Sequence, residues 1–131
     1  AEHLPYQGWQ PVAGTVLDFR NGQKLGDVIH TRADQITSER GINHPFLLKN
    51  GKALAAKLQT KNHTMTLVTT APSVVVYTAN HFDGTGVAHN IKQFDGVALE
   101  CQYPPVSGSD LSAITLLPGE PFTLANTWTF E

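Results

Sequence analysis

The sequence predicts an all-β fold, an antiparallel β-sandwich formed by a single domain that covers residues 1–131. Short stretches of the chain alternate apolar with polar side chains, as half-buried strands do. Turn-forming residues, among the 11 glycines and 8 prolines, separate these stretches at fairly regular intervals. Signals for long helices are sparse, so the core is expected to lie between packed strands.

Strands are expected, in chain order, at residues 45–49, 54–59, 65–67, 73–79, 96–102 and 122–130. The stretch 73–79, SVVVYTA, is β-branched and aromatic, which is typical of a strand buried on both faces. In the last stretch Phe122, Leu124, Trp128 and Phe130 share one parity. This alternation predicts that one face of the final strand is buried.

The connections between these stretches carry turn chemistry. Turns are expected at residues 61–63, 83–86 and 104–105, and the pair Pro118-Gly119 suits the central positions of a type II turn. The evidence for helix is thin along the chain. Residues 23–32 are the one candidate segment, and there Gly26 and β-branched neighbours oppose a long helix. That segment is expected to hold a turn or two of helix.

Composition excludes several classes of partner. The net charge is −2 and no cluster of Lys and Arg forms an electrostatic footprint, so nucleic acid is not expected as a partner. The longest apolar runs are far too short to cross a bilayer, so no membrane association is expected. The single cysteine, Cys101, excludes an internal disulfide and favours a reducing compartment such as the cytoplasm. The Cys101 side chain is interpreted as a small, buried apolar group.

Glu100 is the first candidate for chemistry, because it interrupts an otherwise apolar strand, VALEC at residues 97–101. An acidic residue in such a place is either paired for structural reasons or held partly desolvated for function. Partial desolvation raises the pKa of a carboxylate towards neutrality and makes it a better proton acceptor. The residues alone leave three interpretations open: a functional carboxylate, a structural ion pair, and an exposed position on an edge strand.

The six histidines are scattered, and none has the spacing of a metal-binding pair, so no metal site is predicted. His44 stands out because it precedes Pro45, which favours an extended backbone at the start of a strand. It is either a structural hydrogen-bonding histidine or part of a binding site. Both interpretations remain open.

Five segments together resemble one family. They are PVAGT with LDFR at 11–20, GINHPFLL at 41–48, VYTAN with DG at 76–84, GVALECQ with Pro104 at 96–104, and LPGE at 117–120. In this order they are similar to segments of the aldose 1-epimerases, or galactose mutarotases. The resemblance implies a mutarotase-like sandwich that acts on a free hexose such as galactose or glucose, with neither cofactor nor metal. Because family members have about twice this length, the chain is expected to form the carboxyl-terminal half of the sandwich.

The resemblance also implies roles for individual residues. Glu100 stands at the position of the catalytic base that removes a proton from the C1 hydroxyl, while a histidine protonates the ring oxygen. The family's acid histidine lies in the earlier half, so the isolated chain is expected to be weakly active or inactive. Asn43 stands where the family has a sugar-binding aspartate, beside His44, and Val75 stands where some members have a glutamine. These three residues are the predicted substrate-binding set.

Two departures from the family pattern leave alternatives open. Losing a polar contact costs about 0.5–1.5 kcal/mol, so Asn43 and Val75 also fit a carbohydrate-binding module without catalysis. A third possibility is a purely structural sandwich in which Glu100 pairs with a basic group. A half-sandwich would leave open edges and apolar surface, so self-association or a partner chain that completes the sandwich is expected.

Overall fold

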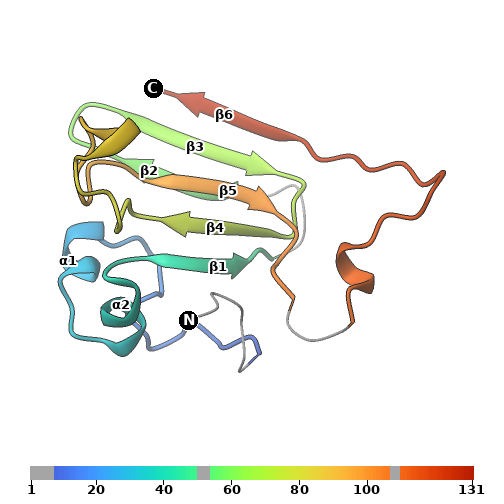
Figure 1. Cartoon of the computed structure of the whole chain (residues 1–131), viewed down its shortest axis with the longest axis horizontal. Coiled ribbons are helices and arrows are strands. Elements are labelled where there is room, and N and C mark those ends of the chain that lie inside the picture. The colour runs from blue at the N-terminus through green and yellow to red at the C-terminus, as the bar shows by residue number, and fades with distance from the viewer. Residues whose placement is uncertain (1–7, 50–53, 107–109) are drawn as a thin grey trace. The chain divides into compact units, whose positions relative to one another are not determined.

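The computed structural model describes residues 8–49, 54–106 and 110–131 (Figure 1). The helices are α1 (Leu25–Ile29) and α2 (Asp34–Glu39), with short 3₁₀ turns η1 (Gly86–Ala88) and η2 (Ser112–Ile114). The strands are β1 (Asn43–Leu47), β2 (Leu54–Gln59), β3 (Thr64–Thr69), β4 (Ser73–Tyr77), β5 (Ala98–Gln102) and β6 (Asn126–Phe130). Neither α1 nor α2, with 5 and 6 residues, is long enough to cross a bilayer.

The strands form two three-stranded sheets, with the orders β1-β4-β5 and β2-β3-β6. β3 pairs antiparallel with β2 on one side and with β6 on the other. The predicted antiparallel, all-β class is therefore confirmed, and each predicted strand overlaps an observed one. The half-sandwich stays a prediction.

The contacts divide the chain into two compact units. Of the described residues, the first unit contains 45–75 and 100–131, and the second contains 8–44 and 76–99. The boundaries fall inside β1, β4 and β5. The expectation of a single domain stays a prediction, and the two units are described one at a time.

The first unit is built on the β2–β3 hairpin. The two strands pair from Leu54 with Val68 to Gln59 with Thr64, with one irregularity between Leu54 and Ala56. The predicted turn at 61–63 is confirmed, since the Thr60 amide donates to the His63 carbonyl at 2.8 Å. Leu67, in the middle of β3, is completely buried.

β6 lies at the edge of this sheet, and one prediction about it is wrong. The alternation in 122–130 predicts a buried face, yet Phe122, Trp128 and Phe130 are 57%, 42% and 73% exposed. The strand itself covers only Asn126–Phe130. Alternation shows which side chains are suited to burial, but burial also requires another segment to cover them, and none in the described part of the chain does so fully.

The approach to β6 contains the predicted type II turn. Gly119 has a φ of +88°, which glycine adopts without steric cost, and the Glu120 amide donates to the Leu117 carbonyl at 3.1 Å. The prediction at Pro118-Gly119 is confirmed.

The second unit places α1 and α2 before β1. Val28, Ile36, Ile42 and Ala79 are its buried apolar residues. α1 lies within the segment 23–32, as predicted, whereas α2 is not predicted. α2 ends where Arg40 adopts a left-handed conformation and the Gly41 amide donates to the Ile36 carbonyl at 2.9 Å.

Candidate functional site

Glu100 lies in β5 of the first unit and its side chain is exposed. The expected partial desolvation of this carboxylate is therefore wrong for the described structure. The physical reason is the geometry of a strand, in which Leu99 and Cys101 point to the opposite face from Glu100. Its neighbours on the same face, Ala98 and Gln102, are small or polar. The apolar sequence around Glu100 does not bury it.

The Glu100 carboxylate makes no hydrogen bond or ion pair with any residue in the described ranges. The structural alternative in which Glu100 pairs with a basic group has no support from those residues, whereas the alternative of an exposed position on an edge strand agrees with the place of β5 at the end of the order β1-β4-β5. An unpaired, exposed carboxylate is free to accept a proton from a ligand.

Val75 lies in β4, also in the first unit, and is half-buried. The Ser73 hydroxyl donates to the Gln102 carbonyl at 2.6 Å, which brings these two positions side by side. β4 and β5 run in opposite directions in Figure 1, and they are neighbours in the sheet. Val75 and Glu100 therefore lie on neighbouring strands of one sheet.

Asn43 and His44 open β1 and belong to the second unit. The Asn43 side-chain amide Nδ2 donates to Glu39 Oε2 at 3.1 Å, and the Asn43 backbone amide donates to His44 Nδ1 at 3.0 Å. Because Nδ1 accepts this bond, the neutral ring carries its proton on Nε2. The structure thus brings Asn43 and His44 together as hydrogen-bonded neighbours.

The electrostatics of His44 agree with a neutral ring. Burial lowers the pKa of His44 below 6.5, and the negative charge of Glu39 opposes this shift without cancelling it. Burial acts in this direction because it penalises the charged imidazolium. His44 is therefore suited to donate a hydrogen bond through Nε2–H. The structural and the binding interpretations of His44 both remain possible.

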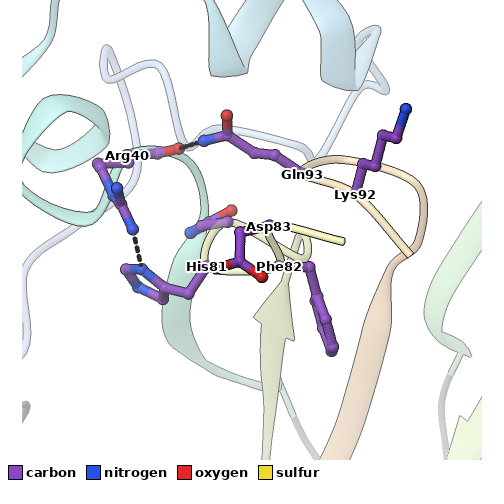
Figure 2. Close-up of a pocket in the computed structure, with 7 residues that line it drawn as sticks. Arg40, His81, Phe82, Asp83, Lys92 and Gln93 are labelled. Atoms are coloured by element: carbon purple, nitrogen blue, oxygen red, sulfur yellow. Dashed lines mark hydrogen bonds between the residues drawn. The ribbon is translucent and has the colours of Figure 1, made fainter. Parts of the chain in front are cut away.

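The second unit also contains a cavity of about 320 Å³ that the sequence does not predict (Figure 2). It is lined by Arg40, Asn80, His81, Phe82, Asp83, Lys92 and Gln93. None of the four predicted site residues lines it. The sequence did hold one indication of this cavity. The family-like segment 76–84 includes Asn80 and Asp83, but no role was predicted for either residue.

The polar groups of this cavity bind one another. Arg40 donates to His81 Nδ1 at 2.7 Å, and Gln93 Nε2 donates to the Arg40 carbonyl at 3.4 Å, as Figure 2 shows. Asp83 Oδ1 accepts from the backbone amide and the hydroxyl of Thr85 at 2.9 and 2.6 Å. These contacts order the loop after β4. They engage His81 through Nδ1 and Asp83 through Oδ1.

Metal-binding side chains do not gather anywhere in the ranges that the structure describes, where no group of three His, Cys, Asp or Glu is placed to hold an ion. Cys101 is a free, half-buried thiol.

Comparison with known proteins decides the family. The family model described as aldose 1-epimerase matches residues 1–126, which is most of the chain. The chain belongs to the aldose 1-epimerase family. The resemblance carried by the five segments is confirmed.

Individual members of the aldose 1-epimerase family show how much of the protein this chain matches. It is 32% identical over 111 residues to an aldose 1-epimerase of Escherichia coli K12, covering 79% of this chain and 32% of that one. It is 32% identical over 127 residues to a galactose mutarotase of Rattus norvegicus, covering 90% and 35%. The chain spans about a third of the length of these curated relatives.

A solved structure, galactose 1-epimerase from Lactobacillus acidophilus NCFM, is similar with a TM-score of 0.85 and 43% identity. The match covers 98% of this chain and 38% of that structure. The mutarotase-like β-fold is therefore confirmed. The position of the chain in the carboxyl-terminal half stays a prediction.

Proposed function

We propose that this chain supplies the catalytic base, Glu100, and part of the sugar-binding surface of an aldose 1-epimerase. The reaction interconverts the α and β anomers of a free hexose such as galactose or glucose. The observation that supports this most directly is the exposed Glu100 carboxylate, which has no partner among the described residues of an aldose 1-epimerase family chain.

The proposed chemistry is acid–base ring opening and reclosure. Glu100 takes the proton of the C1 hydroxyl while an acid protonates the ring oxygen, so the bond between C1 and that oxygen breaks and an open-chain aldehyde forms. Rotation about the C1–C2 bond presents the other face of the aldehyde. In reclosure the former ring oxygen, now a hydroxyl, attacks C1 and gives its proton back to the acid, while Glu100 returns its proton to the C1 oxygen. The sugar is thus isomerised without oxidation and without a cofactor. The acid is a histidine from a part of the protein outside these 131 residues.

The binding roles follow from the side chains. Asn43 Oδ1 accepts a hydrogen bond from a sugar hydroxyl, and His44 donates one through Nε2–H. Val75, on the strand beside Glu100, supplies an apolar contact to the carbon skeleton of the ring. The hexose is the proposed small-molecule partner.

Polarimetry of freshly dissolved α-galactose tests the proposal. The isolated chain is expected to accelerate mutarotation little or not at all, because the acid is missing. In a protein that joins this chain to the rest of the family length, Glu100→Gln is expected to lower kcat by about 10²–10⁴-fold. Glu131→Gln, a matched change at another exposed glutamate, should leave kcat unchanged.

Full activity of Glu100→Gln in the longer protein would refute the role of Glu100 as base. Acceleration by the isolated chain that disappears in Glu100→Gln would instead show that these 131 residues are sufficient, and would refute the assignment of the acid to another part of the protein.

The second candidate function is a carbohydrate-binding module without catalysis. Asn43 and Val75 favour it, because neither supplies the charge or the polar contact that the resemblance implies at those positions. Chemical-shift changes with galactose in NMR spectra, combined with no epimerisation even in the longer protein, would favour this function over catalysis.

Two further assignments belong to the proposal. The exposed apolar side chains of β6 support self-association or a partner chain that completes the sandwich. The free thiol of Cys101 agrees with a reducing, cytoplasmic location.

A further inference from the structure

Glu39 and Asn43 form a side-chain contact across the junction between α2 and β1. Glu39 is the last residue of α2 and Asn43 is the first residue of β1, and both side chains are half-buried. Asn43 Nδ2 donates to Glu39 Oε2 at 3.1 Å. Both residues lie in the second unit.

The chemistry of this contact fixes the orientation of the Asn43 amide. An ionised carboxylate only accepts hydrogen bonds, whereas a primary amide has one donating and one accepting end. Glu39 therefore selects the rotamer in which the amide NH₂ faces it and Oδ1 faces away. No donor from the described residues occupies Oδ1.

The position of Glu39 is not explained by the stability of its helix. Helix carboxyl ends carry partial negative charge, so an acidic residue in the last turn is unfavourable there by a few tenths of a kcal/mol. The last turn of α2 contains no basic residue to offset it. Glu39 accepts a hydrogen bond from the Asn43 amide, and its negative charge also acts on His44.

We infer that Glu39 is a positioning residue for the hexose, holding the Asn43 amide so that Oδ1 accepts a hydrogen bond from a sugar hydroxyl. This inference rests on the proposed function, because it assigns Asn43 to the sugar-binding surface. It adds that residue 39 decides which end of Asn43 the sugar meets. An aspartate at position 43 would need no such orientation, because both of its oxygens accept.

The two positions are therefore coupled. Aspartate at position 43 beside Glu39 would bring two carboxylates to about 3 Å and penalise both. Aspartate at position 43 beside a neutral residue 39 avoids that repulsion and again offers an acceptor. Glu39 suits asparagine at position 43, and a neutral residue 39 suits aspartate there.

The contact itself is tested without sugar, on the 131-residue chain. In ¹⁵N–¹H spectra, one Asn43 side-chain amide proton is expected to be shifted downfield and to exchange slowly with water, because it binds the carboxylate. Glu39→Ala should remove both signatures. Glu39→Gln, whose Oε1 still accepts, should retain them in weaker form.

Sugar affinity is tested by NMR titration with galactose. Glu39→Ala and Asn43→Asp are each expected to raise the Kd by roughly 2- to 12-fold, the effect of one hydrogen bond. The double variant Glu39→Ala with Asn43→Asp should return to within about 2-fold of the unchanged chain. Asp34→Ala, which removes an exposed carboxylate from the same helix, serves as the control and should leave the Kd unchanged.

Two outcomes would overturn the positioning role. One is an Asn43 amide whose signals are the same with and without Glu39. The other is a double variant that binds as weakly as the sum of its single changes. If galactose does not bind the unchanged chain at all, the sugar-binding role of Asn43 is refuted. The amide signals still show whether Glu39 and Asn43 are in contact.

Discussion

At the scale of single residues, Asn80 and Gly41 are the most tightly constrained pair. Asn80 is 1% exposed; its Nδ2 donates to the carbonyls of Glu39 and Ile42 at 3.1 and 2.9 Å, and its Oδ1 accepts from the Thr78 hydroxyl at 2.6 Å. Gly41 packs against it with a φ of +151°. A Cβ at Gly41 would overlap Oδ1 of Asn80. Asn80 cannot move aside without breaking buried hydrogen bonds.

Gly41→Ala is therefore expected to lower the free energy of unfolding by about 2–4 kcal/mol, from backbone strain together with the overlap. Gly26→Ala is the matched control, because Gly26 lies in α1 with open space around its Cβ position. That change should raise the free energy of unfolding by about 0.5–1 kcal/mol. Urea unfolding of both variants measures the difference, and equal effects would contradict the packing described for Gly41.

His44 couples folding to pH. Burial lowers its pKa in the folded chain relative to the value near 6.5 expected when unfolded. The unfolded chain therefore binds a proton at a higher pH than the folded chain does. The stability that depends on neutral His44 is fully present above about pH 6.5 and is lost as the pH falls through the lower, folded pKa.

Between pH 7.5 and pH 5, the free energy of unfolding is expected to fall more for the unchanged chain than for His44→Gln. His63→Gln changes an exposed histidine in the β2–β3 turn, and the free energy of unfolding of this variant should fall as much as that of the unchanged chain. Urea unfolding at the two pH values provides the comparison. A fall of the same size in His44→Gln would show that His44 is not the group responsible.

At the scale of elements, β6 combines an open edge with apolar side chains. It pairs with β3 through Met65 opposite Phe130 and Leu67 opposite Trp128, so the two aromatic residues share the face that carries Leu67. Thr127 and Thr129 occupy the other face. Its fifth residue, Phe130, is 73% exposed, and such an edge favours association with another chain.

Phe130→Lys is expected to weaken self-association of the chain at least several-fold, because it places a charge on this apolar face. The free energy of unfolding should change by less than about 1 kcal/mol, since the side chain is mostly exposed. Thr127→Lys puts the same charge on the opposite face of β6 and should have little effect. Sedimentation velocity over a range of concentrations measures this, and a monomer at every concentration of the unchanged chain would contradict it.

At the scale of the whole molecule, local patterns predicted the strands and turns well. Alternation located β2 and β3, and Pro118-Gly119 predicted its turn, because those features depend on nearby residues. Helix α2 escaped prediction because Asp34, Thr37 and Ser38 are weak helix formers. Its helix is stabilised by the burial of Ile36, at 1% exposure, which only the folded unit provides.

The candidate site was predictable in part. The family-like segments identified Glu100 and Asn43, but the exposure of Glu100 could not follow from its neighbours, which point to the other face of β5. The contact between Glu39 and Asn43 depends on a helix ending four residues before a strand residue, with a turn between them. No local sequence pattern encodes that geometry, so the orientation of the Asn43 amide could be determined only from the structure.

The packing of Gly41 against Asn80 also limits how this sequence can change over generations. Any side chain introduced at position 41 meets Asn80, and shortening Asn80 first removes its hydrogen bonds to the carbonyls of Glu39 and Ile42. Each single-step mutational path therefore passes through a less stable intermediate. Among descendants of a common ancestor, positions 41 and 80 are expected to be retained together or replaced together.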